Sequence, residues 1–354
     1  MLFDYGSFVM LSVIIPTLNE VATICSLINS LRAQQRVSLQ IIVSDGGSTD
    51  NTVNLAATAG STVVRSTRGR GQQMNSGAKT AVHDYLLFLH ADSVIDSPTL
   101  LHDALAAIKQ NASYHGDERT AGHFQLRFVR RLPGQDLAYR RMEAKTALNR
   151  PYTTNGDQGL LISRRFFEHL GGFDESLPFL EDQRIAERIR TEGRWITLPG
   201  TLMTSARRFE TEGFRRRYIL MALIMGLNYA ELPEFFRRAP DVYRAQHEID
   251  TLLLTPYFRL ITSIMAIKPL RERLKIWIRV GRFVRQNLWQ GFFGLDVWLA
   301  GDRSSQNRCL AFYDRVIAPL IANPVGDTVT AGLTFIWAMG VLRPWFRWRE
   351  RRWL

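Results

Sequence analysis

Cysteine is scarce in this sequence of 354 residues, and the two that occur are far apart. Cys25 and Cys309 form no C-x-x-C pair and no Cys/His spacing, which argues against a disulfide framework and against a zinc site. The first ten residues lack any basic residue and any small-residue cleavage site, so they do not resemble a secretory signal. We therefore expect a reducing compartment and a cytoplasmic protein, peripheral on the inner face of the plasma membrane.

Long hydrophobic runs are also lacking. The two longest uncharged helical patterns, residues 218–230 and 328–342, have 13 and 15 residues. Both are shorter than the roughly 20 residues that a membrane-spanning helix needs. The sequence alone therefore predicts no confident transmembrane segment. No internal repeat and no low-complexity segment is present either.

The positive charge is distributed unevenly along the chain. The net charge is +12, from 45 Lys and Arg against 33 Asp and Glu. Residues 1–212 hold 23 basic and 22 acidic residues, a balance of +1, whereas residues 213–354 hold 22 and 11, a balance of +11. This asymmetry predicts two domains: residues 11–212 for chemistry, and 213–354 as a basic module with its own anionic partner.

Short apolar runs alternate with amphipathic stretches through the first domain. The runs are residues 11–15, 40–44, 61–65 and 85–90, and helical patterns follow from about residues 21, 51, 72 and 98. Such alternation predicts an α/β fold with an open, mostly parallel sheet flanked by helices. Later patterns predict strands at 122–128 and 159–165 and helices at 132–149 and 178–195, and residues 213–354 read as mainly helical.

Polar residues follow the four apolar runs, in the segments PTLNE (16–20), DGGSTDNT (45–52), RGRGQQMNSG (68–77) and HADS (90–93). The carboxyl ends of strands are where ligands bind in open α/β sheets. Taken singly, these segments also fit turns, helix caps or a buried histidine. Together their glycines, hydroxyls, arginines and final carboxylate predict a nucleotide diphosphate held with a metal ion.

These motifs, with the acidic pair of PFLEDQRIAERI, resemble the family 2 glycosyltransferases, which are inverting enzymes of GT-A fold. RGRGQQMNSGA, FLHADS, GDQGLLISRR and SARRFETEG are more similar still to a bacterial subgroup described as transferase 2, radical-SAM/selenodomain-associated. The resemblance covers approximately residues 11–244. The remaining C-terminal residues resemble no family that we can name.

The resemblance implies a set of nucleotide- and donor-binding residues. Where the family has two aspartates in the second loop, this sequence has Asp45 followed by Gly46, so one carboxylate of the base contact is missing. Asp157 and Gln158 correspond to positions that face the donor sugar or the acceptor. The full implied set is Pro16, Thr17, Asn19, Glu20, Asp45, Gly47, Ser48, Arg68, Arg70, Asn75, His90, Asp157, Gln158, Arg207 and Arg208. The arginines are placed there because guanidinium groups bind phosphate, although surface ion pairs are their commoner role.

The family's D-x-D metal motif aligns with residues 90–92, HAD. The resemblance implies that Asp92 holds Mg²⁺ or Mn²⁺ together with the donor diphosphate. His90 would contact the ribose or the diphosphate, and its imidazole favours Mn²⁺ over Mg²⁺. The alternative is a purely structural role, in which Asp92 caps a turn and His90 packs in the core.

The family's acidic pair aligns with Glu181 and Asp182. Inverting transfer needs a carboxylate that takes the proton of the acceptor hydroxyl, and the resemblance implies Asp182 for this role, with Glu181 as the second choice. Both could instead stabilise the N-terminus of a helix, and one residue can do both.

The sequence thus predicts a metal-dependent inverting glycosyltransferase that moves a sugar from a nucleotide-diphosphate donor to a hydroxyl acceptor, for which a lipid-linked molecule is one option. The final residues, RPWFRWRERRWL, combine Arg and Trp as membrane-interface segments do, which favours an anionic membrane over nucleic acid as the partner of the basic module. The alternative to membrane contact is that residues 218–230 form a core helix and that the C-terminal tail is solvated. A catalytically degenerate nucleotide-sugar-binding or membrane-tethering protein and a nucleotidyltransferase remain as other functions.

Overall fold

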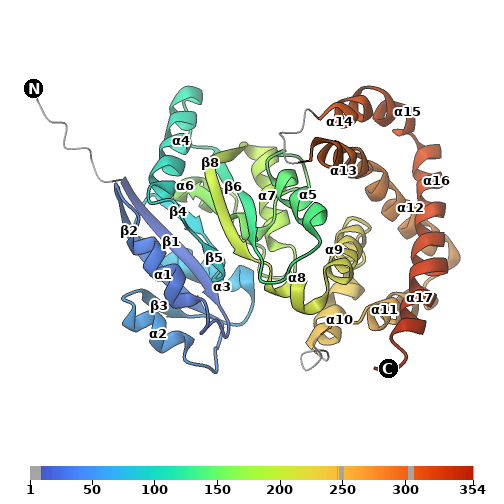
Figure 1. The fold of residues 1–354 in the computed structure, drawn as a ribbon, viewed down its shortest axis with the longest axis horizontal. Helices are drawn as coiled ribbons and strands as arrows, with labels where there is room; N and C mark the ends of the chain where they lie inside the picture. The colour runs from blue at the N-terminus through green and yellow to red at the C-terminus, as the bar shows by residue number, and fades with distance from the viewer. Residues whose placement is uncertain (1–8, 245, 247–250, 302–306, 354) are drawn as a thin grey trace, which may run out of the picture. The chain divides into compact units, whose positions relative to one another are not determined.

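The computed structural model describes residues 9–244, 246, 251–301 and 307–353 (Figure 1). The described chain forms two compact units. Unit 1 consists of the described residues up to Arg130 together with Met142–Ala206, and unit 2 consists of Arg131–Arg141 and the described residues from Arg207 onward.

Unit 1 is built on an eight-stranded sheet with the order β3-β2-β1-β4-β7-β6-β8-β5. The pairs β1–β2, β2–β3, β1–β4 and β6–β8 are parallel, whereas β4–β7, β6–β7 and β5–β8 are antiparallel. The predicted α/β class is confirmed, and the sheet is mixed because β7 returns against β4. The strands are β1 Val9–Thr17, β2 Val37–Asp45, β3 Thr62–Arg65, β4 Tyr85–Phe88, β5 Ser93–Val94, β6 Thr120–Val129, β7 Leu160–Ser163 and β8 Arg194–Ser205.

Helices cover both faces of this sheet. Leu11, Val13 and Ile15 of β1 belong to one buried cluster, which includes residues of α1 and α4. Ile14, between them in sequence, belongs to a second cluster with residues of α3, α6 and α7. Both faces of β1 are therefore buried, which is why its sequence is a continuous apolar run. The helices of unit 1 are α1 Ile24–Arg32, α2 Thr52–Thr58, α3 Arg70–Thr80, α4 Leu100–His115, α6 Arg164–His169 and α7 Glu181–Glu192.

Strand β8 was not predicted, because Pro199 and Gly200 interrupt its sequence as turn residues do. Thr197 pairs with His123, and the next pairing joins Thr201 to Gln125, so three residues of β8 oppose one of β6. Pro199 lies within this bulge, where its missing N–H group removes no regular ladder hydrogen bond. A single proline and glycine therefore hid a strand of 12 residues.

Unit 2 is helical, as predicted for the C-terminal part of the chain. Residues 218–230 lie largely in α9, which buries Leu220, Gly226 and Leu227. The predicted helix 132–149 is shorter, as α5, and its first residues belong to this unit. The helices are α5 Asp136–Thr146, α8 Arg207–Glu212, α9 Phe214–Tyr229, α10 Pro233–Arg244, α11 Thr255–Ala266, α12 Leu270–Gln286, α13 Trp289–Ala300, α14 Arg308–Phe312, α15 Ala318–Ile321, α16 Pro324–Phe335 and α17 Arg343–Arg349, with π-helical turns η2 Tyr313–Ile317 and η3 Ile336–Leu342.

Residues 328–342 lie inside a helix that is longer than the uncharged pattern found in the sequence. Helices α16, η3 and α17 are continuous and form a rod, Pro324–Arg349, of 26 residues, whose most apolar stretch has a mean hydropathy of 1.4 and is 17% buried. The rod is long and apolar enough to cross a bilayer, by length and composition only. The earlier count stopped at Asp327 and Arg343, two charged residues that the helix includes.

The end of the rod is held by a buried carboxylate, not left as a solvated tail. Glu350 is 0% exposed and pairs with the Arg216 guanidinium. Its two oxygens also accept the backbone N–H groups of Leu254, at 3.1 Å, and of Thr255, at 2.9 Å, at the start of α11. Glu350 thus satisfies donors of a helix N-terminus that would otherwise be unpaired.

Replacing Glu350 with Ala should lower the free energy of unfolding by about 3–5 kcal/mol, because it leaves the partly buried Arg216 and two backbone N–H groups without their partner. Urea unfolding followed by circular dichroism measures this loss. Arg351→Ala, an exposed neighbour, is the control and should change stability by about 0.5 kcal/mol or less. Equal effects of the two variants would contradict the anchoring role of Glu350.

Candidate functional site

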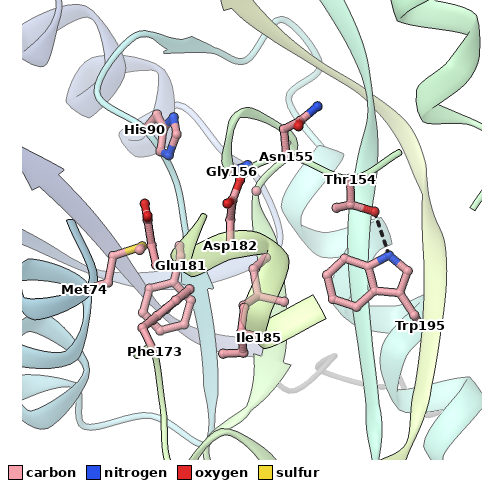
Figure 2. Close-up of a pocket in the computed structure, with 13 residues that line it drawn as sticks. Met74, His90, Thr154, Asn155, Gly156, Phe173, Glu181, Asp182, Ile185 and Trp195 are labelled. Atoms are coloured by element: carbon pink, nitrogen blue, oxygen red, sulfur yellow. Dashed lines mark hydrogen bonds between the residues drawn. The ribbon is translucent and has the colours of Figure 1, made fainter. Parts of the chain in front are cut away.

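A pocket in unit 1 gathers residues from the predicted motifs (Figure 2). His90 follows β4, the segment 154–156 precedes β7, and the acidic pair opens α7. Apolar side chains form much of its wall, and Figure 2 draws Phe173 below Glu181 and Ile185 below Asp182. The lining residues are Met74, Phe88, His90, Thr154, Asn155, Gly156, Gly159, Leu160, Phe173, Glu181, Asp182, Ile185 and Trp195.

Asp182 lies in the first turn of α7 and is held by two backbone donors. Its Oδ2 accepts the N–H of Gly156 at 2.6 Å, and its Oδ1 accepts the N–H of Gln183 at 2.8 Å. Burial and, second, the charge of Glu181 raise the pKa of Asp182 to about 6, although Arg70 and the two hydrogen bonds oppose this rise. A carboxylate with this pKa can accept a proton near neutral pH, as a general base must.

Glu181 is buried and forms an ion pair with Arg70. The distance from Arg70 Nη1 to Glu181 Oε1 is 3.1 Å. Burial alone would lower the pKa of Arg70, but Glu181, Asp182 and Asp157 together raise it. The Arg70 side chain is still 41% exposed. Arg70 therefore balances one of the two adjacent carboxylates, while its open side leaves room for the phosphate contact predicted from the sequence.

Three potential metal ligands come together beside the pocket. The ligand atoms of His90, Asp92 and Asp157 all lie within 4.8 Å of one another, and His90 Nδ1 lies 2.6 Å from Asp157 Oδ1. The sequence predicted Asp92 as the metal ligand and gave the other two to the donor. One imidazole and two carboxylates fit Mn²⁺ well, since carboxylates suit hard divalent ions and imidazole suits Mn²⁺ better than Mg²⁺.

Gly156 stands between these ligands and the proton acceptor. A Cβ atom at this position would lie 2.6 Å from His90 Nε2 and 3.5 Å from Asp182 Oδ2. Only glycine therefore lets the loop pass between the two side chains while its N–H binds Asp182. Sequence reasoning missed Gly156, although it lies next to Asp157 in a stretch that was singled out.

The predicted nucleotide loops are shaped around Asp45, which is 3% exposed. Its Oδ2 accepts the N–H groups of Gly47 and Ser48, each at 2.9 Å, and its Oδ1 accepts the Thr17 hydroxyl at 3.2 Å. The carboxylate is thus used within the loop. Asn19, with a φ of 57°, joins the same loop by donating its N–H to the Ser48 hydroxyl at 2.9 Å.

Gly46 occupies the position where the resembled family has its second aspartate, and packing explains the glycine. A Cβ there would lie 2.9 Å from the Gln73 amide carbon. Gln73 is buried and donates to the carbonyls of Thr17, at 2.7 Å, and Ser44, at 3.0 Å. The Gln73 side chain therefore fills the space that a longer residue at 46 would need.

Other predicted site residues hold the framework of unit 1. Gln158 is fully buried, accepts the N–H of Asn155 at 2.9 Å and lies 2.8 Å from His123 Nδ1, so it positions the loop and does not line the pocket. Asn75 binds both backbone groups of Phe173. In both cases the sequence identified the segment but not the direction of the side chain.

The remaining predicted residues are not among those that line the pocket. Glu20 accepts the Thr23 hydroxyl at 3.1 Å, Pro16 lies near the end of β1, and Arg68 is exposed on the loop before α3. Arg207 and Arg208 open α8 in unit 2, so their predicted contact with phosphate stays a prediction.

Sequence reasoning missed two buried aromatic residues, Trp195 in the pocket lining and His123, which stacks on it. His123 is 0% exposed and stacks on Trp195, with ring centroids 5.3 Å apart. Burial lowers the pKa of His123 to about 4, so the ring is neutral. Trp195 donates its Nε1–H to the Thr154 hydroxyl at 3.1 Å, as Figure 2 shows. These contacts fix the segment that carries Gly156 and Asp157; no sequence motif marks them.

Residues 12–171 match the family model described as glycosyl transferase family 2. This match makes residues 12–171, somewhat less than half of the chain, similar to the glycosyl transferase family 2 domains. The mixed sheet flanked by helices is the GT-A type of fold. The match contains β1 to β7, His90, Asp92 and Asp157, and it ends before the acidic pair.

Curated relatives agree with the family of this domain. An uncharacterized glycosyltransferase of Haemophilus influenzae is 26% identical over 181 residues, which are 49% of this chain and 59% of the relative. A PGL/p-HBAD biosynthesis glycosyltransferase of Mycobacterium bovis is 33% identical over 152 residues, or 37% of this chain and 59% of the relative. The chain thus covers little more than half the length of these relatives.

Among solved structures, the chain is similar to residues 1–349 of S. aureus TarS in complex with UDP. The sequences are 19% identical, the TM-score is 0.45, and the match covers 96% of this chain and 86% of the other. This likeness carries no conclusion about substrate.

Replacing Gly156 with Ala should lower the free energy of unfolding by about 1–3 kcal/mol, because the added methyl group overlaps the His90 ring. Gly291→Ala is the matched control, since a Cβ at Gly291, inside α13, has no atom within 4 Å; this change should be neutral or stabilise by up to about 1 kcal/mol. Thermal and urea unfolding of both variants measure the difference. A stable Gly156→Ala protein would show that the loop has room to move.

Proposed function

We propose that this chain is a metal-dependent inverting glycosyltransferase that moves a sugar from a nucleotide-diphosphate donor to an acceptor hydroxyl. The observation that carries the proposal is the pairing of Asp182, a proton acceptor with a pKa of about 6, with the cluster of His90, Asp92 and Asp157 across a single glycine. The family 2 match of residues 12–171 supports the same reaction class. The subgroup suggested by the sequence stays a prediction.

In the proposed reaction, Asp182 takes the proton of the acceptor hydroxyl while that oxygen attacks the anomeric carbon. The bond to the donor diphosphate breaks on the opposite face, so the configuration at the anomeric carbon inverts. Gly156 N–H keeps the Asp182 carboxylate oriented, and the Arg70–Glu181 pair limits the negative charge beside it. Glu181 is the second choice as base, but its ion pair with Arg70 makes it the weaker one.

A divalent ion, Mn²⁺ or Mg²⁺, would neutralise charge on the leaving diphosphate. Asp92 and Asp157 would hold it through carboxylate oxygens, and His90 through a ring nitrogen. Arg70, and Arg68 on the same loop, would contribute further positive charge. The donor's base would lie near the Asp45 loop, where the Gly46 substitution removes a carboxylate and leaves the nucleotide undetermined.

We also place the reaction at the cytoplasmic face of a membrane, with an acceptor that is lipid-linked. The excess of +11 in residues 213–354 and the apolar rod of unit 2 support this location. The alternative of a binding protein without turnover is favoured by the missing carboxylate at Gly46, and the intact Asp182 counts against it.

Asp182→Asn should lower the turnover of a nucleotide-sugar panel by roughly 100-fold or more, while donor affinity stays nearly unchanged, because the amide cannot accept the proton. Diphosphate release measures turnover, and calorimetry with Mn²⁺ and the donor measures affinity. Glu187→Gln, an exposed carboxylate of the same helix, is the control and should retain activity. Turnover by the Asn variant at the wild-type rate would remove Asp182 as the base.

The pH profile of the wild type provides a second readout of the same group. Because the pKa of Asp182 is raised, the carboxyl is protonated below about pH 6 and cannot act as a base there. The rate should therefore rise as the pH passes through about 6 and then level off. A rate that is flat from below to above this pH would contradict the assignment.

Asp157→Asn and Asp92→Asn should each weaken Mn²⁺ binding by roughly tenfold or more, because each removes one carboxylate ligand. Mn²⁺ titration followed by electron paramagnetic resonance measures this affinity without turnover. Asp96→Asn is the matched control, since Asp96 is exposed close by in sequence and lies outside the cluster. If chelator-treated protein kept full activity, the metal site would be wrong even though the fold is right.

A further inference from the structure

The rod Pro324–Arg349 buries only a narrow stripe of residues. Ala331, Ala338 and Phe346 are its buried apolar residues, and Asp327 near its start and Glu350 just after its end are buried too. The spacing between buried positions is close to multiples of four residues. In an α-helix of 3.6 residues per turn, side chains at such spacing point in gradually changing directions around the helix axis. The π-helical segment η3 has more residues per turn, which reduces this change of direction. The rod thus contacts unit 2 along one side.

The rest of the rod is apolar and exposed. Val325 is 71% exposed, Leu333 64%, Ile336 60% and Trp337 51%. No charged residue lies between Asp327 and Arg343. A helix that faces water carries its charges on the exposed side and its apolar residues on the buried side. In the rod this distribution of charged and apolar residues is reversed, because the carboxylates of Asp327 and Glu350 are buried and apolar side chains are exposed. The exposed side therefore needs an apolar partner.

Both ends of the rod are tied to other helices of unit 2. Asp327 Oδ1 accepts from Arg285 Nε at 2.6 Å and its Oδ2 from Arg282 Nε at 2.8 Å, both on α12. At the other end Glu350 binds Arg216 of α9 and the start of α11. The two carboxylates are 23 residues apart, or about 35 Å along a helix.

Helix α12 runs in contact with α16, and their backbones approach closely (Figure 1). A Cβ on Gly281 would collide with the backbone of Ala331. Exposed positions of α12 carry charges that include Arg271, Glu272, Lys275 and Arg279. To cross the hydrocarbon layer, the rod would have to detach from α12 or carry this strongly charged helix into the bilayer with it. Each charge at the bilayer centre has a high free-energy cost, so crossing is unfavourable.

We infer that the rod lies flat in the surface of an anionic membrane, with its apolar side at the boundary between headgroups and acyl chains, and does not cross the bilayer. Arginines cluster at its end with exposed Trp345 and Trp348, and this pairing matches anionic headgroups. The basic residues of this end are Arg343, Arg347, Arg349, Arg351 and Arg352. The inference rests on the membrane location in the proposed function and is independent of the chemistry.

Flotation of the full chain on vesicles tests the surface. The chain should float with vesicles of equal parts phosphatidylcholine and phosphatidylglycerol, and less with phosphatidylcholine alone. Leu333→Lys with Ile336→Lys should reduce the bound fraction by roughly tenfold or more, because two apolar contacts are lost. Val82→Lys with Tyr114→Lys, at exposed positions of unit 1, is the matched control and should float as the wild type does. Equal flotation of both variants overturns the proposal.

Depth measurements separate a flat rod from a crossing one. Cys25→Ser and Cys309→Ser allow single cysteines at Val325, Leu333 or Val341 to carry a fluorophore that is quenched by lipids spin-labelled at shallow or deep positions. A flat rod gives the same shallow depth at the three positions. Deep quenching at Leu333 with shallow quenching at Val325 overturns the proposal in favour of crossing.

Two further outcomes have distinct meanings. A lipid-free dimer that the Leu333→Lys, Ile336→Lys variant disrupts, with no flotation of the wild type, would assign the surface to a second copy and overturn the proposal. Asp182→Asn should float as the wild type does. Diphosphate release without vesicle binding would therefore contradict this inference and the proposed membrane location but not the proposed chemistry. Vesicle binding without diphosphate release would contradict the proposed chemistry alone.

Discussion

The hydrogen bond from Gly156 N–H to Asp182 Oδ2 is the constraint on which the site depends. It joins the segment before β7 to the first turn of α7, two parts of the chain that the sheet brings together. Asp157 follows directly and reaches His90. Because Gly156 has no side chain, the cation ligands and the base can approach from opposite sides of one residue. A larger residue would separate the two functions of the site.

The two adjacent carboxylates of the site differ in their charged partners, and this difference sets the charge of the site. Two adjacent carboxylates begin α7, but only Glu181 has the Arg70 guanidinium within ion-pair distance in the described structure. Burial of Asp182 and the negative charge of Glu181 raise the pKa of Asp182, while backbone N–H groups keep its carboxylate oriented. The same pair of residues therefore supplies a structural anion, Glu181, and the carboxylate that we propose as proton acceptor, Asp182. The difference lies in their partners, since the residue types are nearly the same.

Local pattern predicted the first half of the sheet and the segments of the site, because apolar runs and polar strand ends are local signals. Strand β8 was missed because Pro199 acts in a bulge, whose position depends on pairing with β6. Similarly, Gln158 turns inward toward His123 while Asp157 turns toward His90, and only the packed structure distinguishes these neighbours. The site was predictable as a set of segments, whereas the directions of its side chains depend on long-range contacts.

The reversed rod of unit 2 illustrates a limit of composition-based reasoning. Asp327 interrupts an apolar stretch in the sequence, yet its carboxylate is buried against Arg282 and Arg285, so the interruption does not end the apolar surface. The charges that bear on membrane contact lie in residues 213–354, whereas residues 1–212 are nearly neutral. Salt that screens exposed charges over about 10 Å should therefore weaken the proposed association with anionic lipid and act little on Glu181, whose side chain is 3% exposed. In the function proposed here, the excess charge of the C-terminal part determines where the chain acts, and the residues around Gly156 determine how it acts.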